Sequence, residues 1–215
     1  MKNLIFKLLA LSLLMNLDPE TLDAQNGKKD VVVTISTSFG EMTVILYDET
    51  PKHKANFLKL VEEGFYDSTA FHRVIQNFMI QGGDPYSKAG GTGGPVGTGG
   101  PGYTVDAEFV PGITHVKGAL AAARQGDQVN PKRASSGSQF YIVHSEAGCR
   151  GLNGQYTVFG RVVKGLEVVD AIATQPTNRS RGDQPVTPIY MTMTAEKMSR
   201  KKIEKEFGYQ YPEEK

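Results

Sequence analysis

The segment from Phe71 to Asp84 carries the side chains best suited to chemistry, in the order FHRVIQNFMIQGGD. If residues 71–75 form a strand, Arg73 shares a face with the apolar residues two positions away on either side. Phe78 and Met79 follow closely, so a guanidinium that stays protonated in proteins lies in an apolar setting. Periodicity alone favours a surface arginine whose stem covers core residues, and a catalytic arginine is the alternative.

Other reactive side chains do not form a recognisable site. Cys149 is the single cysteine, so an intramolecular disulfide is impossible and an ordinary packed or loop thiol is expected. Ser138 lies outside a GxSxG nucleophile elbow. No two histidines have the i, i+4 spacing of a helical metal site, so we expect no metal; they stand at His53, His72, His115 and His144.

The glycine-rich segment 90–102 contains two GTGGP copies and a formal GxGxxG match that starts at Gly97. A dinucleotide fingerprint of that form needs a strand before it and a helix after it. Pro101 and the β-like residues 103–105 stand where the helix should begin. We therefore interpret the segment as a flexible surface loop and expect no cofactor.

The elements that position these residues have mostly strand-like patterns. Residues 31–36 and 41–47 flank a turn at 38–40, which indicates an antiparallel hairpin. Further short strands are expected at 71–75, 78–81, 118–122, 139–143, 158–163 and 189–195.

Two helices are expected among these strands. The first has Thr50 as a candidate N-cap, Pro51 as its first residue and Gly64 as its stop. The second covers residues 166–173. Many short strands with few helices indicate a β-barrel or sandwich.

The composition fits one compact domain with short appendages: 215 residues, of which 39% are hydrophobic. The net charge of +1 is spread along the chain, so we expect no nucleic-acid partner. We divide the chain into a signal peptide at 1–24, a linker at 25–30, a main domain at 31–197, and a charged C-terminal helix and tail at 198–215. In that last part Ile203 and Phe207 have helical spacing.

The N-terminus has the pattern of a signal peptide. Lys2 and Lys7 flank the start of an apolar run, residues 4–17, that is too short to span a membrane comfortably. Ala24 is a candidate cleavage point, although an acidic stretch at 18–23 precedes it. We expect export to a bacterial periplasm and no stable membrane insertion after cleavage. Secretion, or anchoring by an uncleaved N-terminal segment, are the alternatives.

Several separated blocks resemble the cyclophilin family of peptidyl-prolyl cis-trans isomerases. These are FHRVIQNFMIQGGD, GALAAA from residue 118, SGSQFYI from residue 136 and LNGQYTVFG from residue 152, in the family's order. The likeness runs from about residue 31 to residue 195. It implies a mainly β fold: a closed eight-stranded antiparallel β-barrel capped by two α-helices, with the substrate groove on its outer wall.

The resemblance also implies roles for individual residues. Arg73 is implied to be the catalytic arginine, with Gln81 beside it in the catalytic site. The pocket for the proline ring is implied to be lined by Phe78, Met79, Tyr141 and Leu152. The substrate backbone is implied to bind along Gln81, Ala123 and Gln139. Tyr156, which stands where many members have histidine, is also implied to bind the substrate.

The implied activity is isomerisation of X–Pro bonds during the folding of exported proteins, without cofactor or metal. Amide resonance sets a barrier of about 18–20 kcal/mol, so the enzyme must bind the twisted amide better than either planar form. The expected partners are proline-containing unfolded or flexible polypeptides, and the chain is expected to act as a monomer. A noncatalytic proline-peptide-binding chaperone and a structural protein acting through its C-terminal tail are the alternatives.

Two positions depart from the best-known eukaryotic members of the family. Gly151 stands where those members have a tryptophan that contacts cyclosporin, so weak cyclosporin affinity is expected. Arg124 replaces an asparagine that hydrogen-bonds the substrate.

Overall fold

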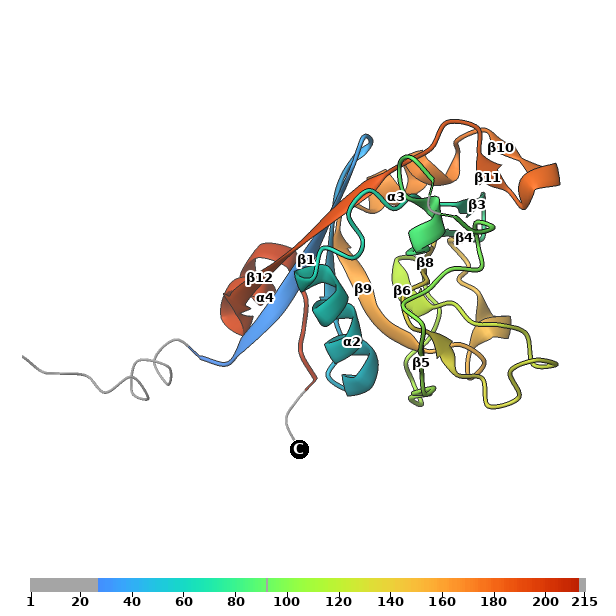
Figure 1. Cartoon of the computed structure of the whole chain (residues 1–215). Coiled ribbons are helices and arrows are strands. Elements are labelled where there is room, and N and C mark those ends of the chain that lie inside the picture. The colour runs from blue at the N-terminus through green and yellow to red at the C-terminus, as the bar shows by residue number, and fades with distance from the viewer. Residues whose placement is uncertain (1–26, 92, 213–215) are drawn as a thin grey trace, which may run out of the picture.

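The computed structural model describes residues 27–91 and 93–212, so the expected signal peptide at 1–24 lies outside it. Eight strands form one sheet in the order β12-β1-β2-β9-β6-β8-β4-β3, with every neighbouring pair antiparallel (Figure 1). The strands are β1 Lys29–Thr37, β2 Gly40–Leu46, β3 Arg73–Ile75, β4 Met79–Gly82, β6 Ala119–Ala122, β8 Phe140–Val143, β9 Val158–Lys164 and β12 Met191–Ser199.

The two ends of this sheet come close without pairing. Within the described residues β12 and β3 share no ladder. The segments just before them meet through an isolated bridge between Ala70 and Tyr190, and the Phe71 N–H donates to the Ile189 carbonyl at 2.9 Å. The mainly β fold with few helices is confirmed. The closed eight-stranded barrel is not established by the strand pairing and stays a prediction.

The expected strands are present, with shifted ends. The largest shift is at β12, which continues past residue 195 because Ser199 pairs with Lys29 at the start of β1. The sequence pattern missed two small sheets of two-residue strands, because pairs this short leave no periodicity to detect. These sheets pair β5 (Thr104–Val105) with β7 (Ser135–Ser136), and β10 (Thr177–Asn178) with β11 (Gln184–Pro185).

Helices α2 (Pro51–Glu62) and α3 (Leu166–Ala173) occupy their expected ranges and cover the main core. The ring of Phe57 on α2 meets the ring of Phe140 on β8 edge-on, with centroids 5.7 Å apart. Ile172 of α3 has no exposed surface. Both helices therefore bury one apolar face against the same side of the sheet.

The cap of α2 differs from the expected one. Thr50 does precede the helix, but its hydroxyl donates to the Tyr47 carbonyl at 3.3 Å instead of accepting a bond from the first turn. The carboxylate of Glu108 takes that place, accepting the N–H groups of Lys52 at 3.1 Å and His53 at 3.0 Å. The first turn is thus capped from a distant loop, which satisfies backbone donors that a helix leaves without partners.

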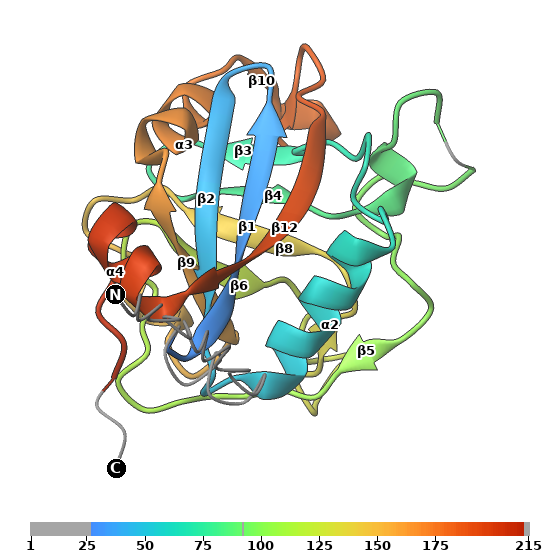
Figure 2. The ribbon, with the colours of Figure 1, turned by 90° about the vertical axis from the view of Figure 1, so that its left-hand side faces the viewer.

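The C-terminal segment forms the expected helix and packs onto the domain. Helix α4 (Arg200–Phe207) begins where the Ser199 hydroxyl accepts the Lys202 N–H at 3.3 Å. Ile203 is fully buried in a small cluster with Val32, Ile45 and Met198. Figure 2 shows α4 beside one end of the three neighbouring strands β2, β1 and β12.

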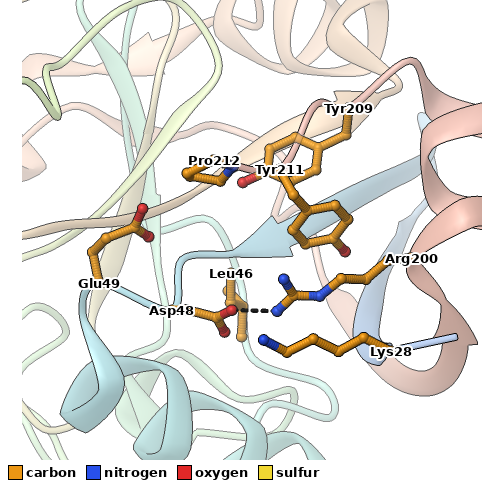
Figure 3. A pocket seen from close by; sticks show the side chains of 8 residues that line it. All are labelled: Lys28, Leu46, Asp48, Glu49, Arg200, Tyr209, Tyr211 and Pro212. Atoms are coloured by element: carbon orange, nitrogen blue, oxygen red, sulfur yellow. Dashed lines mark hydrogen bonds and ion pairs between the residues drawn. The ribbon is translucent and has the colours of Figure 1, made fainter. Parts of the chain in front are cut away.

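Polar contacts fix the tail that follows α4. The guanidinium of Arg200 pairs with Asp48 and lies over the ring of Tyr211, 4.2 Å from its centroid. The Tyr211 hydroxyl donates to Asp30 at 3.1 Å. A hollow of about 250 Å³ remains between these groups and Glu49 (Figure 3). None of the helices in the described part of the chain has the length and apolarity needed to cross a membrane.

Candidate functional site

Three neighbouring strands bring predicted site residues into one row. Arg73 of β3 is opposite Gln81 of β4, Gln81 is opposite Tyr141 of β8, and Tyr141 is opposite Ala121 of β6. Side chains directly opposite one another on paired strands lie on the same face. This face carries its own apolar cluster, separate from the main core under the helices. The row therefore places a cation, an amide and an aromatic ring side by side on the outer face.

A hollow of about 120 Å³ opens on this face. Eight of the nine predicted site residues line it, with Arg124 in addition: Arg73, Phe78, Met79, Gln81, Ala123, Arg124, Tyr141, Leu152 and Tyr156. These residues come from segments that are far apart in the sequence. The fold thus gathers side chains that the sequence could connect only by resemblance.

Arg73 stands at the edge of this hollow. Its guanidinium carbon is 5.9 Å from the centroid of the Phe78 ring, and its Nη1 donates to the Gln81 Oε1 at 3.4 Å. That distance is long for a hydrogen bond, so the contact with Gln81 is weak: it orients the guanidinium but leaves its N–H donors largely available. A guanidinium has five N–H donors, and the half-buried Arg73 can therefore donate to a bound molecule.

A tight turn presents Phe78 to Arg73. Asn77 lies in the left-handed region at φ 61°, which asparagine tolerates better than most residues, and its N–H donates to Nδ1 of His144 at 2.9 Å. The Phe78 N–H donates a hydrogen bond to the Ile75 carbonyl at 3.1 Å. The short β3–β4 connection is thereby held rigidly on both sides of Phe78.

Gln139 is the one predicted site residue that does not line the hollow. It is only 7% exposed, and its Oε1 accepts the amide of Gln81 at 3.1 Å. Its Nε2 donates to the carbonyls of Gly97 at 3.1 Å and Gly99 at 2.8 Å. Gln139 thus braces Gln81 and the glycine-rich loop from behind, and direct contact with substrate stays a prediction.

The glycine-rich loop is tied down at a second point. The carboxylate of Asp84 accepts the N–H groups of Tyr86 at 2.7 Å, Gly99 at 3.2 Å and Gly97. A Cβ on Gly99 would lie 2.2 Å from an Asp84 oxygen, so glycine is required for this approach. The part of the loop that meets Asp84 and Gln139 is therefore bonded to the domain, in contrast to the flexible loop expected from composition.

A buried polar chain supports Tyr141 from below. Both the backbone N–H and the Nδ1 of His115 lie 2.9 Å from Oδ1 of Asn153, which as a carbonyl oxygen can only accept. Nδ1 of His115 therefore carries the proton. Its Nε2 accepts the Tyr141 hydroxyl at 2.9 Å. Burial lowers the pKa of His115 and raises that of Tyr141, so both are neutral in the folded protein near neutral pH.

His115 and Asn153 were not recognised from the sequence as parts of the site. Neither spacing nor local pattern distinguishes them, since the residues they contact lie 26 and 38 positions away along the chain. The rings of His115 and Tyr141 are also stacked, with planes 13° apart, so the two side chains contact through their faces as well as through the hydrogen bond.

Arg124 forms the far rim of the hollow. Its guanidinium lies 4.5 Å from the centroid of the Tyr156 ring, and its Nε donates to the Gln155 carbonyl at 2.8 Å. Nη1 pairs with Asp127 at 2.6 Å. This charge is therefore neutralised locally, and its main effect is to hold the Tyr156 ring in place.

The site offers no arrangement for metal or thiol chemistry within residues 27–91 and 93–212. No three histidine, cysteine, aspartate or glutamate side chains gather there in the way a metal ion needs. The Cys149 sulfur lies 3.8 Å from the Phe78 carbonyl, and burial raises the pKa of its thiol. The thiol is therefore protonated near neutral pH, as a packed cysteine would be.

Comparison with known proteins identifies consistent relatives. Residues 32–196 match the family model described as cyclophilin type peptidyl-prolyl cis-trans isomerase/CLD. The chain is 40% identical over 159 residues to peptidyl-prolyl cis-trans isomerase CYP18-1 of Arabidopsis thaliana, covering 73% of this chain and 90% of that one. It is 46% identical over 140 residues to peptidyl-prolyl cis-trans isomerase B of Bacillus subtilis, covering 64% and 82%.

Solved structures agree with these relatives. A crystal structure of a cyclophilin type peptidyl-prolyl cis-trans isomerase from Cryptosporidium parvum superposes with a TM-score of 0.67 at 30% identity, covering 79% of this chain and 98% of that one. A second structure of that protein, in the presence of the dipeptide Ala-Pro, gives a TM-score of 0.65 at 31% identity, covering 76% and 97%.

Proposed function

This chain belongs to the cyclophilin family of peptidyl-prolyl cis-trans isomerases, and from that premise we propose that Arg73 is its catalytic residue and that exported polypeptides are its substrates. The isomerase activity itself follows from the family. The observation that carries the assignment of Arg73 is the guanidinium held over Phe78 at the edge of an apolar hollow.

The proposed mechanism requires no bond to be made or broken. When the X–Pro amide twists, resonance is lost and the proline nitrogen regains a lone pair. The Arg73 guanidinium donates a hydrogen bond to that nitrogen, in the transition state only. A hydrogen bond from a charged donor contributes roughly 1.5–3 kcal/mol, which corresponds to about one to two factors of ten in rate.

The remaining acceleration is assigned to the walls of the hollow. Phe78, Met79, Tyr141 and Leu152 form an apolar surface that holds the pyrrolidine ring while the preceding carbonyl rotates. The planar amide is more dipolar than the twisted one, so an apolar site disfavours the ground state relative to the transition state.

The proposed substrates are unfolded or flexible chains that contain proline. The related Cryptosporidium parvum protein was crystallised in the presence of Ala-Pro, which supports a proline-containing ligand for this hollow. We propose likewise that the chain acts as a monomer. Both points remain proposals for this protein.

Export is supported by sequence alone. Lys2, Lys7 and the apolar run at 4–17 have the pattern of a signal peptide, with Ala24 as the candidate cleavage point. We place the mature protein in the periplasm of a bacterium. Cell fractionation followed by N-terminal sequencing tests this: a mature chain that begins near Gln25 is expected, and an intact N-terminus in the cytoplasmic fraction contradicts it.

A noncatalytic chaperone would use the same hollow for binding alone. NMR exchange spectroscopy on a short X–Pro peptide separates the two functions. The proposal predicts exchange cross-peaks between cis and trans forms at catalytic amounts of protein, because the uncatalysed exchange takes tens to hundreds of seconds. Binding shifts without accelerated exchange would favour the chaperone.

A further inference from the structure

A second hollow adjoins the proline pocket. It encloses about 240 Å³ between the loop at 108–114 and the segment at 153–158. Tyr156 lines this hollow and the proline pocket alike. The ring of Tyr156 is held in position by Arg124 above it and by an edge-on contact with Tyr141, at a centroid distance of 6.0 Å. One side chain, held by these contacts, therefore belongs to the walls of both hollows.

The walls of the second hollow are mainly apolar. Its side chains include Phe109, Val110, Ile113 and Val158, together with the ring of Tyr156. Phe109 is 41% exposed, so part of this apolar wall faces solvent. An exposed apolar surface next to a binding site favours an apolar occupant.

Three polar residues besides Tyr156 also line this hollow, namely Glu108, Thr114 and Asn153, and the side-chain oxygens of Glu108 and Asn153 already accept hydrogen bonds within the fold. The carboxylate of Glu108 accepts both N–H groups at the start of α2 and the Nδ1 of His53 at 2.6 Å. Oδ1 of Asn153 accepts both donors of His115. Because these acceptors are used within the protein, Glu108 and Asn153 offer little to a polar or cationic side chain.

The two hollows adjoin, because Tyr156 lines both, so one extended substrate can enter both. A peptide chain advances by about 3.3 Å per residue when extended, and side chains two residues apart point to the same side. Because the hollows share Tyr156, a side chain about two residues from a proline in the first hollow can reach the second.

We propose that this second hollow is a subsite for an apolar side chain two residues from the proline of the same substrate chain. The proposal rests on the proposed function, because it takes the first hollow to be the proline site. Apolar residues become buried when a protein folds, so a subsite of this kind selects proline bonds in segments that are exposed only while a chain is unfolded.

The test compares peptides that differ at one position. Each has a central Ala-Pro with leucine, serine or lysine two residues before or two residues after the proline, and kcat/KM is measured by NMR exchange or a protease-coupled assay. For the wild-type protein we expect leucine to raise kcat/KM about tenfold over serine at one of the two positions, by burial of its side chain.

Phe109→Ala should reduce the leucine preference to less than about threefold and leave kcat/KM for the serine peptide unchanged. Phe39→Ala is the matched control, since Phe39 is 36% exposed and lies in the β1–β2 turn, outside both hollows. This control should keep the full leucine preference. The unchanged serine peptide shows that each variant is folded.

The outcomes separate this inference from the function on which it rests. Equal kcat/KM for leucine and serine at both positions, or a leucine preference that survives Phe109→Ala, overturns the subsite while isomerase activity remains. A preference for lysine also overturns it, because Glu108 would then select the substrate. Absence of isomerisation with every peptide contradicts the proposed function instead.

Discussion

Nη1 of Arg73 lies 3.4 Å from Oε1 of Gln81, its direct partner across the β3–β4 ladder. Gln81 is itself oriented, because its Nε2 donates to Gln139 at 3.1 Å and Gln139 is bonded to the glycine-rich loop. The amide oxygen of Gln81 therefore faces the guanidinium in one defined orientation. The position of Arg73 is thus set by a chain of contacts that extends through Gln81 and Gln139 to the glycine-rich loop.

Replacing Arg73 should lower catalysis without unfolding the protein. We expect Arg73→Ala to reduce the exchange rate of an X–Pro peptide at least tenfold, because one charged hydrogen bond to the transition state is lost. Arg73→Lys keeps the positive charge but not the planar guanidinium, so its exchange rate should lie between those of the wild type and Arg73→Ala. Circular dichroism should be unchanged, since Arg73 is only half-buried.

Arg161→Ala is the control for this series, because Arg161 is an exposed residue on β9. It should retain the full exchange rate. A rate for Arg73→Ala equal to that of the wild type would falsify the catalytic role of Arg73.

Removing the Tyr141 hydroxyl should destabilise the protein although the ring remains. Tyr141→Phe leaves Nε2 of His115 without its donor, and His115 is 2% exposed. A buried acceptor that loses its partner costs about 1–3 kcal/mol of unfolding free energy. Tyr190→Phe alters a tyrosine that is 41% exposed and should stay within about 0.5 kcal/mol of the wild type. Urea denaturation measures both, and equal stability of the two variants contradicts the buried contact.

The stability should fall as the solution becomes mildly acidic. Burial lowers the pKa of His53, His72 and His115 from the ordinary value of 6.5. Between that value and the lower folded-state pKa values, the unfolded chain binds more protons than the folded one. The free energy of unfolding therefore keeps its full value with respect to these histidines above pH 6.5 and declines as the pH falls below it. Carboxylates titrate mainly below about pH 4.5, so the window from about pH 6.5 to 5 reports on the histidines.

Urea unfolding at a series of pH values tests this, with His115→Gln expected to show a smaller decline than the wild type. Nitrogen-15 NMR supplies an independent check, because His115 should be neutral with its proton on Nδ1. A free energy of unfolding that stays constant or rises as the pH falls from about 7 to about 5 would contradict this prediction.

The C-terminal helix should contribute to stability but not to catalysis. Ile203→Ala removes a fully buried side chain and should lower the free energy of unfolding by about 2–5 kcal/mol. The exposed Lys201, two residues earlier in the same helix, offers a control, and Lys201→Ala should have little effect. Both variants should keep the wild-type exchange rate under native conditions. A loss of activity in folded Ile203→Ala would mean that α4 communicates with the hollow.

Local patterns in the sequence predicted most elements that carry the site. The β-branched and alternating runs gave the strands, and Pro51 with Gly64 bounded α2, because such signals depend on neighbouring residues. Strand alternation correctly placed Arg73 on one face with Ile75. The same expectation was wrong for Phe71, because β3 begins only at Arg73 and Phe71 lies in the main core. The grouping of Arg73 with Tyr141 and Leu152 did not follow from alternation, since periodicity alone favoured an ordinary surface arginine, and only the resemblance brought the separate blocks together.

Long-range polar contacts could not be predicted from the sequence. The Glu108 cap of α2, the His115–Asn153 support and the Gln139 brace each join residues that are far apart along the chain. None produces a periodic pattern or a local motif. Such contacts depend on where the backbone places both partners, so they emerge only once the sheet order is known.

The cross-strand row from Arg73 through Gln81 to Tyr141 has a practical consequence for refolding. Slippage of one residue between β3, β4 and β8 would turn these side chains inward and bring core residues to the outer face. Turnover is therefore a built-in reporter of strand alignment. A refolded sample could regain its secondary structure and still be inactive in the exchange assay, and that lack of activity would indicate a mispaired sheet.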